Sequence, residues 1–311
     1  DGLADVTRAF MIARALKRYN IDICFAGGNN RFSELIAKEP FLYIELPELS
    51  LHNTRNLSRK GQVQTYDLLK KSVECDLAQI LDFNPDLCVS SFRLSAYIST
   101  RIANVPLVSI GFIYWLDEFY NAVMPEVDNR FCLPSGFRRW PKNIDELGFC
   151  SENFIRLLDE YRITGLRGFR DILRTDLNII PDIDNLFISL STVKWRNDVV
   201  FVGPLVWKPN KKDWKNNIPK RKGITRITVT LGSTGSKSNR DLILKALNDD
   251  SISVTSYGIN ESDCSSESFF QNVVPGDLVA KNTDILICHG GIGTIYQYLR
   301  EGVPMIGVPE D

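Results

Sequence analysis

Short apolar runs alternate with amphipathic segments along most of this chain. Runs of about four to six residues between turn signals are typical of strands buried in a parallel sheet, and apolar positions three and four residues apart indicate helices. Strands are predicted over 21–25, 41–46, 87–90, 107–110, 177–180, 186–190, 199–202, 226–231, 252–256, 269–273, 284–288 and 305–308. Helices are predicted over 5–19, 31–38, 62–83, 94–103 and 239–247, and after Gly276 and Thr294. This alternation predicts an α/β protein with doubly wound parallel sheets.

A polar stretch over 206–223 interrupts the alternation. It is rich in Lys, Asn and Pro, which is typical of a linker, and no RNA-binding motif accompanies its charges. At 311 residues the chain is long enough for about two domains. We therefore expect one domain over 1–205 and a second over 224–311.

Composition argues against several classes of function. A net charge of −1 provides no overall field to recruit nucleic acid or a membrane. With only two histidines, and no CxxC pair among seven cysteines, the chain is not expected to hold zinc. The scattered cysteines are typical of free, buried thiols in a reducing compartment such as the cytoplasm. No apolar run reaches the ~20 residues that a membrane span needs.

Two glycine-rich turns carry the strongest functional signal. One is LGSTGSKS over 231–238, and the other is HGGIGT over 289–294. Each follows a predicted strand, and we expect the two strands to be neighbours in one sheet. Glycines there let a ligand approach the backbone, and the free N–H groups and dipole of a helix amino end favour an anion such as phosphate. His289 and Thr294 add side-chain donors, so we expect an anion site at this edge.

Neither turn matches a familiar nucleotide-phosphate motif. A dinucleotide fingerprint that began with Gly291 and Gly293 would need a small residue where Tyr296 stands. A P-loop needs glycine immediately before its lysine, but Ser236 precedes Lys237. We therefore do not expect ATP hydrolysis.

The segment HGGIGTIYQYLREGVPMIGVP, over 289–309, resembles the donor-binding signature of nucleotide-sugar-dependent glycosyltransferases of the GT-B fold. It is most similar to bacterial enzymes related to macrolide, glycopeptide and sterol glucosyltransferases, and more distantly to the peptidoglycan enzyme MurG. Upstream, VGPL at 202–205, LGS at 231–233 and VPGDL at 274–278 stand in the order that such enzymes show. The resemblance covers nearly the whole chain and is strongest toward its end.

The resemblance implies two Rossmann-like domains that face a cleft. Residues 1–205 would bind the acceptor, and residues 224–311 would bind the donor after the linker over 206–223. The first strand of the fold and its closing elements are expected to lie outside the 311 residues. The implied reaction moves a sugar from a nucleotide-diphosphate donor, expected to be a UDP-sugar, to an acceptor hydroxyl with inversion. No cofactor is expected.

The resemblance also assigns donor-binding roles, from the base to the sugar. The backbone at Val274 and Pro275 would border the base, and Glu310 and Asp311 stand near the place where the family binds the sugar hydroxyls. Between them, the diphosphate would be held by Gly232, Ser233, His289, Gly290, Gly291, Gly293 and Thr294. No acidic pair of the DxD type accompanies these residues, so the charge of the diphosphate is expected to be stabilised without a metal.

The acceptor side carries weaker signals. Asp5 falls at the turn where related enzymes place a His or Asp facing the sugar, so it is the implied base for the acceptor hydroxyl. Asp5 is also suited to cap the helix that it begins, and both interpretations stay open. His52 and Trp115 are weaker candidates for acceptor contact.

An aromatic and basic segment over 111–175 interrupts the first domain. It is consistent with helices that pack on the domain edge with aromatic core residues. It is also consistent with a surface that binds a small-molecule or lipid-linked acceptor, with peripheral contact at the inner face of the membrane.

Two alternative functions stay open. A UDP-sugar 2-epimerase shares the fold, but it should need further acidic and basic residues in the cleft. A donor-binding module that needs a partner chain would bind UDP without transferring or hydrolysing the sugar.

Overall fold

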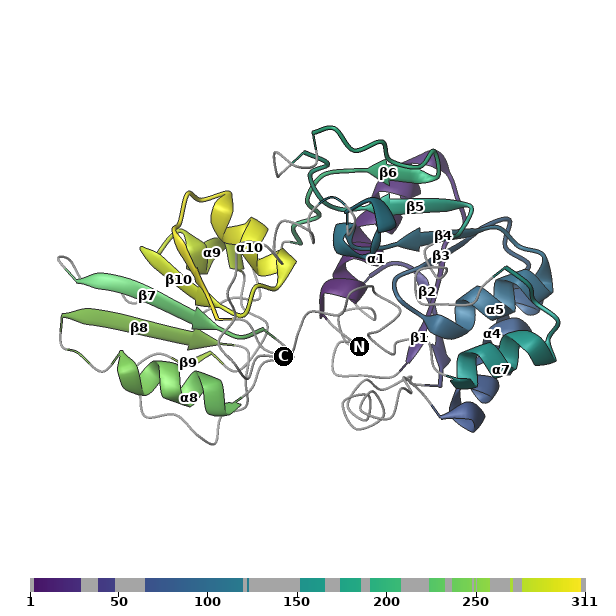
Figure 1. Cartoon of the computed structure of the whole chain (residues 1–311), viewed down its shortest axis with the longest axis horizontal. Coiled ribbons are helices and arrows are strands. Elements are labelled where there is room, and N and C mark those ends of the chain that lie inside the picture. Colours follow the sequence, from purple (N-terminus) through teal and green to yellow (C-terminus); the bar gives the residue numbers. More distant parts are fainter. Residues whose placement is uncertain are drawn as a thin grey trace. The chain divides into compact units, whose positions relative to one another are not determined.

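The protein divides into two compact units, Leu3–Leu205 and Val206–Asp311 (Figure 1). The computed structural model describes residues 3–28, 39–47, 65–119, 122, 152–165, 174–185, 191–207, 224–232, 237–247, 249, 251–257, 269–270 and 276–308. Each unit combines helices with parallel strands, so the predicted α/β class is confirmed.

The N-terminal unit contains two parallel sheets. In one, β1 (Cys24–Gly28) pairs with β2 (Leu42–Leu46). In the other, shown side by side in Figure 1, the order is β3 (Cys88–Ser90), β4 (Leu107–Ile110), β5 (Leu177–Ile180) and β6 (Val199–Phe201). The helical elements are α1 (Leu3–Leu16), η1 (Lys17–Tyr19), α4 (Tyr66–Phe83), α5 (Leu94–Ala103), η3 (Ile113–Trp115) and α7 (Glu152–Glu160).

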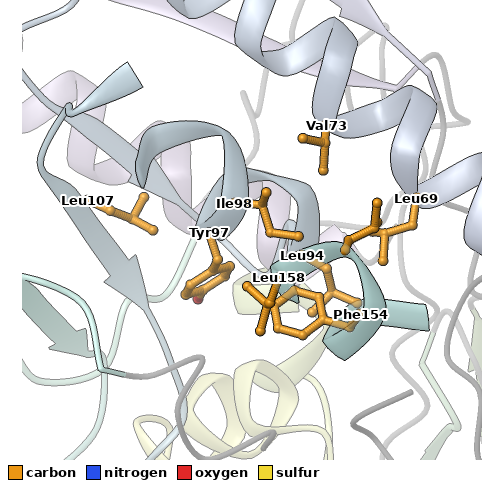
Figure 2. Packing of buried hydrophobic residues seen from close by; sticks show 9 residues of the cluster. Leu69, Val73, Leu94, Tyr97, Ile98, Leu107, Phe154 and Leu158 are labelled. Carbon is orange, nitrogen blue, oxygen red and sulfur yellow. The ribbon is translucent and has the colours of Figure 1, made fainter. Parts of the chain in front are cut away.

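A buried cluster between α4, α5, α7 and β4 forms the main core of this unit (Figure 2). Its side chains are Leu69, Val73, Leu94, Tyr97, Ile98, Leu107, Phe154, Leu157 and Leu158. Full burial of such a side chain contributes about 1.5–3 kcal/mol. The hydroxyl of Tyr97 is paired with Ser109 Oγ at 2.9 Å, and burial raises the pKa of Tyr97 to about 12. The core therefore holds β4 firmly without leaving this polar group unpaired.

Three helical elements of this unit end on an asparagine in the left-handed conformation. Asn20, Asn84 and Asn104 follow η1, α4 and α5 with φ values of 56°, 51° and 54°. The N–H of Asn84 donates to the carbonyl of Ile80 at 2.8 Å, which closes the last turn of α4. Asparagine adopts this conformation more readily than most residues, so it ends a helix sharply.

The C-terminal unit has a five-stranded parallel sheet in the order β11-β10-β7-β8-β9. Its elements are β7 (Thr225–Thr230), α8 (Lys237–Ala246), β8 (Ile252–Tyr257), β9 (Phe269–Phe270), α9 (Gly276–Ala280), β10 (Ile285–Cys288), α10 (Ile292–Leu299) and β11 (Met305–Gly307). The first strand, β7, lies in the middle, and the chain continues to one side with β8 and to the other with β10. This is the doubly wound order, and ligands bind such sheets beyond the carboxyl ends of the strands where the order reverses.

Two predictions about the first residues are wrong. Helix α1 begins at Leu3, so Asp5 lies inside its first turn rather than at the N-cap; an acidic side chain there still interacts favourably with the helix dipole. The first strand is Cys24–Gly28 rather than 21–25, because the pairing with β2 sets the register and draws Gly27 and Gly28 into the sheet.

Other predictions have a mixed outcome. The predicted helix over 31–38 and strand over 186–190 lie outside the described residues. Cys24, Cys75, Cys88 and Cys288 are free thiols, as expected, but only Cys288 is buried. Within the described ranges, no helix is both long and apolar enough to cross a membrane.

Candidate functional site

The two glycine turns meet where the strand order of the C-terminal sheet reverses. Strands β7 and β10 are parallel neighbours, and Thr230 at the end of β7 is opposite Cys288 at the end of β10. Gly232 therefore emerges beside His289 at the carboxyl edge of the sheet. The prediction that the two strands are neighbours is confirmed, and their turns lie at the point where open α/β sheets bind ligands.

The imidazole of His289 is wedged between two glycines, one from each side of this edge. A Cβ atom added to Gly232 would lie 2.5 Å from Cε1 of His289, and one added to Gly291 would lie 2.9 Å from the same atom. Gly232 also has φ +66°, a conformation that side chains other than Asn and Asp rarely adopt. Glycine is thus required at both positions for the ring to stand where it does.

Between the ring and the helix, the chain turns at Gly290, which has φ +96°. Its N–H group points at the sulfur of Cys288. Burial raises the pKa of the Cys288 thiol, and this N–H contact only partly opposes the effect. Since the thiolate is the reactive form, Cys288 is a structural residue rather than a nucleophile.

The amino end of α10 is open to a ligand. Gly291 is the N-cap and makes no side-chain cap, and the first hydrogen bond of the helix runs from Ile295 N to Gly291 O at 3.0 Å. The preceding N–H groups of the first turn, at Ile292, Gly293 and Thr294, have no partner inside the helix. Apart from the backbone of α10 itself and the chain neighbours of Gly293, no atom of the described residues lies within 4 Å of where a Cβ of Gly293 would be. This first turn offers N–H donors around open space.

One nitrogen of His289 has no hydrogen-bond partner within the described part of the chain. Nδ1 is buried and makes no hydrogen bond with any described residue. A buried polar atom without a partner costs about 1–3 kcal/mol, so such atoms often mark a place where an ion, a water or a ligand completes the bonding.

The same edge carries Gln297, which is not one of the donor-binding residues expected from the sequence. Its side-chain amide lies against the start of α9, because a Cβ added to Gly276 would lie 2.0 Å from Gln297 Oε1. Gln297 follows Thr294 by three residues, so both lie on one side of α10. The three-residue spacing from Thr294 is the sequence signal that could have identified Gln297 as a site residue.

In the N-terminal unit, α1 brings Asp5 and Arg8 together at the carboxyl edge of the four-stranded sheet that contains β4. Arg8 Nη1 lies 4.0 Å from Asp5 Oδ1, with the Arg8 side chain 5% exposed and that of Asp5 23% exposed. The guanidinium lies over the ring of Phe112, 4.4 Å from its centroid. Phe112 follows β4, so this contact holds the N-terminal half of α1 against the end of that strand.

Two further side chains, Tyr114 and Asp182, belong to this group. The ring of Tyr114 stacks on that of Phe112 with centroids 5.1 Å apart, and it is 44% exposed. Burial of its hydroxyl raises the pKa of Tyr114 to about 12, so this phenol is neutral at any physiological pH. Asp182, which follows β5, is buried, and its Oδ1 accepts a hydrogen bond from Ile183 N at 2.8 Å.

Several predicted site residues lie outside the described residues. They are His52, Ser233, Val274, Pro275, Glu310 and Asp311, together with the side chain of Trp115, whose backbone ends η3. Among the side chains that are described, no group of three or more His, Cys, Asp or Glu could hold a metal ion.

Comparison with curated proteins identifies similar sequences along almost the whole chain. A PGL/p-HBAD biosynthesis rhamnosyltransferase from Mycobacterium bovis BCG is 26% identical, over 98% of this chain and 69% of its own. A PGL/p-HBAD biosynthesis glycosyltransferase from Mycobacterium tuberculosis is 26% identical, over 99% of this chain and 74% of its own. No protein-family model matches the sequence.

Solved structures with the same architecture are also glycosyltransferases. The Streptomyces glycosyltransferase SsfS6, complexed with thymidine diphosphate, superposes with a TM-score of 0.60 over 96% of this chain and 76% of its own, at 16% identity. The spinosyn rhamnosyltransferase SpnG, also complexed with thymidine diphosphate, gives 0.59 over 98% and 78%, at 13% identity. The chain is a glycosyltransferase of the GT-B fold.

The resemblance found in the sequence is therefore confirmed for the fold and the class of enzyme. In this glycosyltransferase the glycine turns and His289 occupy the carboxyl edge of the C-terminal sheet, and Asp5 occupies the carboxyl edge of the N-terminal sheet.

Proposed function

We propose that this glycosyltransferase takes its sugar from a nucleoside-diphosphate donor, and that the C-terminal unit binds the diphosphate without a metal. The observation that carries the proposal is the meeting of the two glycine turns on the imidazole of His289. A diphosphate at this edge would accept hydrogen bonds from the first turn of α10 and from the ring nitrogen that has no described partner.

Uridine is the nucleotide that the sequence resemblance favours, and thymidine is the second candidate. The solved structures of SsfS6 and SpnG are complexes with thymidine diphosphate, and the M. bovis relative is named a rhamnosyltransferase. Among the contacts proposed for the base, Val274 and Pro275 immediately precede Gly276, whose backbone lies against the amide of Gln297. We therefore add Gln297 as a polar group that would approach the nucleoside.

Charge stabilisation without a metal follows from the donors at this edge. A departing diphosphate gains negative charge, and pre-oriented N–H groups stabilise such charge most strongly where water is excluded. The helix dipole of α10 acts in the same direction. No other cofactor is proposed.

Asp5 is the proposed base, and the proposed outcome at the anomeric carbon is inversion. The acceptor hydroxyl would attack the anomeric carbon as the bond to the diphosphate breaks, and its proton would pass to a carboxylate oxygen of Asp5. The first-turn position of Asp5 favours the ionised form that this role requires.

The two alternatives receive no further support. The relatives and solved structures described above are named glycosyltransferases, which favours transfer over 2-epimerisation. A donor-binding module would bind nucleotide through the same turns, so only a rate measurement separates it from an enzyme. The small-molecule or lipid-linked acceptor, and contact with a membrane surface, also remain proposals.

Calorimetric titration with UDP and TDP tests the donor site. His289→Ala should weaken binding of the preferred nucleotide by ~1.5–3 kcal/mol, the scale of a hydrogen bond to a charged group. Arg300→Ala is the control, because Arg300 lies at the other end of α10 and pairs with Glu301. Unchanged affinity in a folded His289→Ala variant would contradict the assignment.

A further inference from the structure

Arg8 is an unusual residue for the inside of a small α/β unit. Its side chain is only 5% exposed, although a guanidinium is always charged and is costly to bury without compensation. Burial lowers the pKa of Arg8 from its ordinary value, and the nearby groups of Asp5, Tyr114 and Asp182 oppose that shift. The unit thus retains a buried positive charge beside the proposed base.

The contacts of Arg8 fix its position rather than neutralise Asp5. The guanidinium carbon lies over the ring of Phe112, 4.4 Å from its centroid, in a cation–π contact, and Phe112 is itself stacked on Tyr114. Its separation from Asp5 Oδ1, 4.0 Å, is too long for a hydrogen bond. Asp5 therefore lies close to the positive charge of Arg8, and Nη1 and Oδ1 form an ion pair without a hydrogen bond.

Asp182 also contributes to the electrostatic surroundings of Arg8, whereas the Tyr114 phenol stays neutral with its pKa near 12. The ion pair that the structure shows is the one between Arg8 and Asp5. Without Arg8, Asp5 would lose this nearby positive charge and would bind a proton more readily.

We propose that Arg8 is the positioning residue for Asp5. Held in place by its contact with Phe112, Arg8 keeps the Asp5 carboxylate ionised, so that it can take the proton of the acceptor hydroxyl. The inference rests on the proposed role of Asp5 as base, but its first test does not use activity. It also explains why an arginine serves here, because the planar guanidinium stacks on a ring in a way that a lysine ammonium does not.

The direct test is an NMR titration of the Asp5 carboxyl carbon in protein labelled with ¹³C-aspartate, with Asp5→Asn used to assign the signal. In Arg8→Met the titration midpoint should rise by at least ~1 pH unit, the usual effect of losing a nearby opposite charge. Arg8→Lys should fall between Arg8→Met and the unmodified protein. Arg14→Gln is the matched control on the same helix, because Arg14 pairs with Glu39, and it should leave the midpoint in place.

The second readout is the pH dependence of nucleoside-diphosphate release from UDP-glucose and TDP-rhamnose. In Arg8→Met the acid limb of the kcat/KM profile should shift to higher pH, together with the NMR midpoint. If Arg8 served only for packing, its substitution would lower the rate equally at every pH. An unmoved midpoint in folded Arg8→Met overturns the proposal, and so does a moved midpoint with an unmoved acid limb. If Arg8→Met does not fold, Arg8→Gln takes its place in both measurements.

The two proposals fail in different ways. A moved midpoint together with normal turnover in Asp5→Asn would show that Arg8 controls the ionisation of Asp5 but that Asp5 is not the base, which overturns the proposed mechanism and, with it, the positioning role. Loss of nucleotide binding in His289→Ala bears only on the C-terminal unit.

Discussion

The carboxyl edges of the two units are built in opposite ways. In the C-terminal unit, Gly232 and Gly291 leave bare backbone around a single imidazole, that of His289. In the N-terminal unit, the charged side chains of Asp5 and Arg8 on α1 lie beside the ring of Phe112 at the end of β4, and that of Arg8 is buried. One edge offers backbone N–H groups to a ligand, and the other offers a carboxylate whose charge depends on its neighbours.

The difference shows how one architecture supports two kinds of site. At Gly232 and Gly291 the backbone leaves no room for an added atom, because the ring of His289 already fills the space beside each glycine. A site made of side chains tolerates changes of shape better than changes of charge. Substitutions can therefore be chosen to damage one edge and spare the other.

Asp5→Asn should have the largest effect, and this effect should fall on the rate of sugar transfer alone. Asn retains the shape of Asp but cannot usefully accept a proton, so we expect transfer to fall at least ~100-fold with nucleotide affinity and melting temperature nearly unchanged. Asp67→Asn is the matched control, because Asp67 also lies in the first turn of a helix, α4. Turnover close to that of the unmodified enzyme would leave Asp5 with a structural role only.

Gly232→Ala should have the next largest effect, and on nucleotide binding. The added methyl group would collide with the ring of His289, so we expect UDP or TDP to bind ~10-fold more weakly or worse, with displaced hydrogen bonds to a charged group as the cause. Gly302→Ala is the control that separates the collision with His289 from backbone strain. Gly302 has a similar φ of +71°, but none of the described neighbouring atoms lies within 4 Å of its Cβ position. Both variants should lose about 1–2 kcal/mol of stability. Equal nucleotide affinity in the two variants would show that the collision with His289 does not matter.

The smallest effect concerns the opposite edge of the C-terminal sheet. The guanidinium of Arg226 donates a hydrogen bond to Asp284, with Nη2 2.6 Å from Oδ1. This hydrogen bond, and to a smaller extent the one from the backbone N–H of Arg226, lowers the pKa of Asp284 to about 2. Because the folded-state pKa lies below the unfolded value of about 3.9, the pair stabilises the fold above that pH, and the contribution is lost as the pH falls toward 2. The side chain of Asp284 is 41% exposed, so we expect on the order of 1 kcal/mol or less.

Urea denaturation of Asp284→Asn measures this contribution. The variant should be less stable than the unmodified protein at neutral pH, and the difference should shrink toward about pH 2. Nucleotide affinity at neutral pH should not change, since Asp284 precedes β10 at the edge away from His289. A stability difference that is the same at both pH values would exclude titration of Asp284 as its source.

The placement of the two glycine turns in the C-terminal unit could be predicted from sequence because their signals are local. Glycines in a strand–turn–helix pattern mark the turns at Gly232 and at Gly290, and the apolar runs before them mark β7 and β10. The boundaries of α5, β4 and β5 were predicted correctly for the same reason, since each is a clear apolar pattern, closed by Asn104 in the case of α5.

What could not be predicted depends on contacts between distant parts of the chain. Arg8 meets Phe112 only after α1 packs against the end of β4, and a lone arginine in a helical pattern predicts a solvent-exposed position. Gln297 became visible only through its contact with Gly276. The register of β1 was missed because it is set by pairing with β2 and not by its own residues.

The wedge of His289 between Gly232 and Gly291 also has an evolutionary consequence. The two turns are 57 positions apart in sequence, counting from Gly232 to His289, yet neither can change alone without loss of fit. In a lineage that gains a side chain at the first turn, the ring at the second turn has to shift or to be replaced by a smaller residue. Among homologues of this protein the two positions should therefore covary, with bulk at one accompanied by a smaller residue at the other.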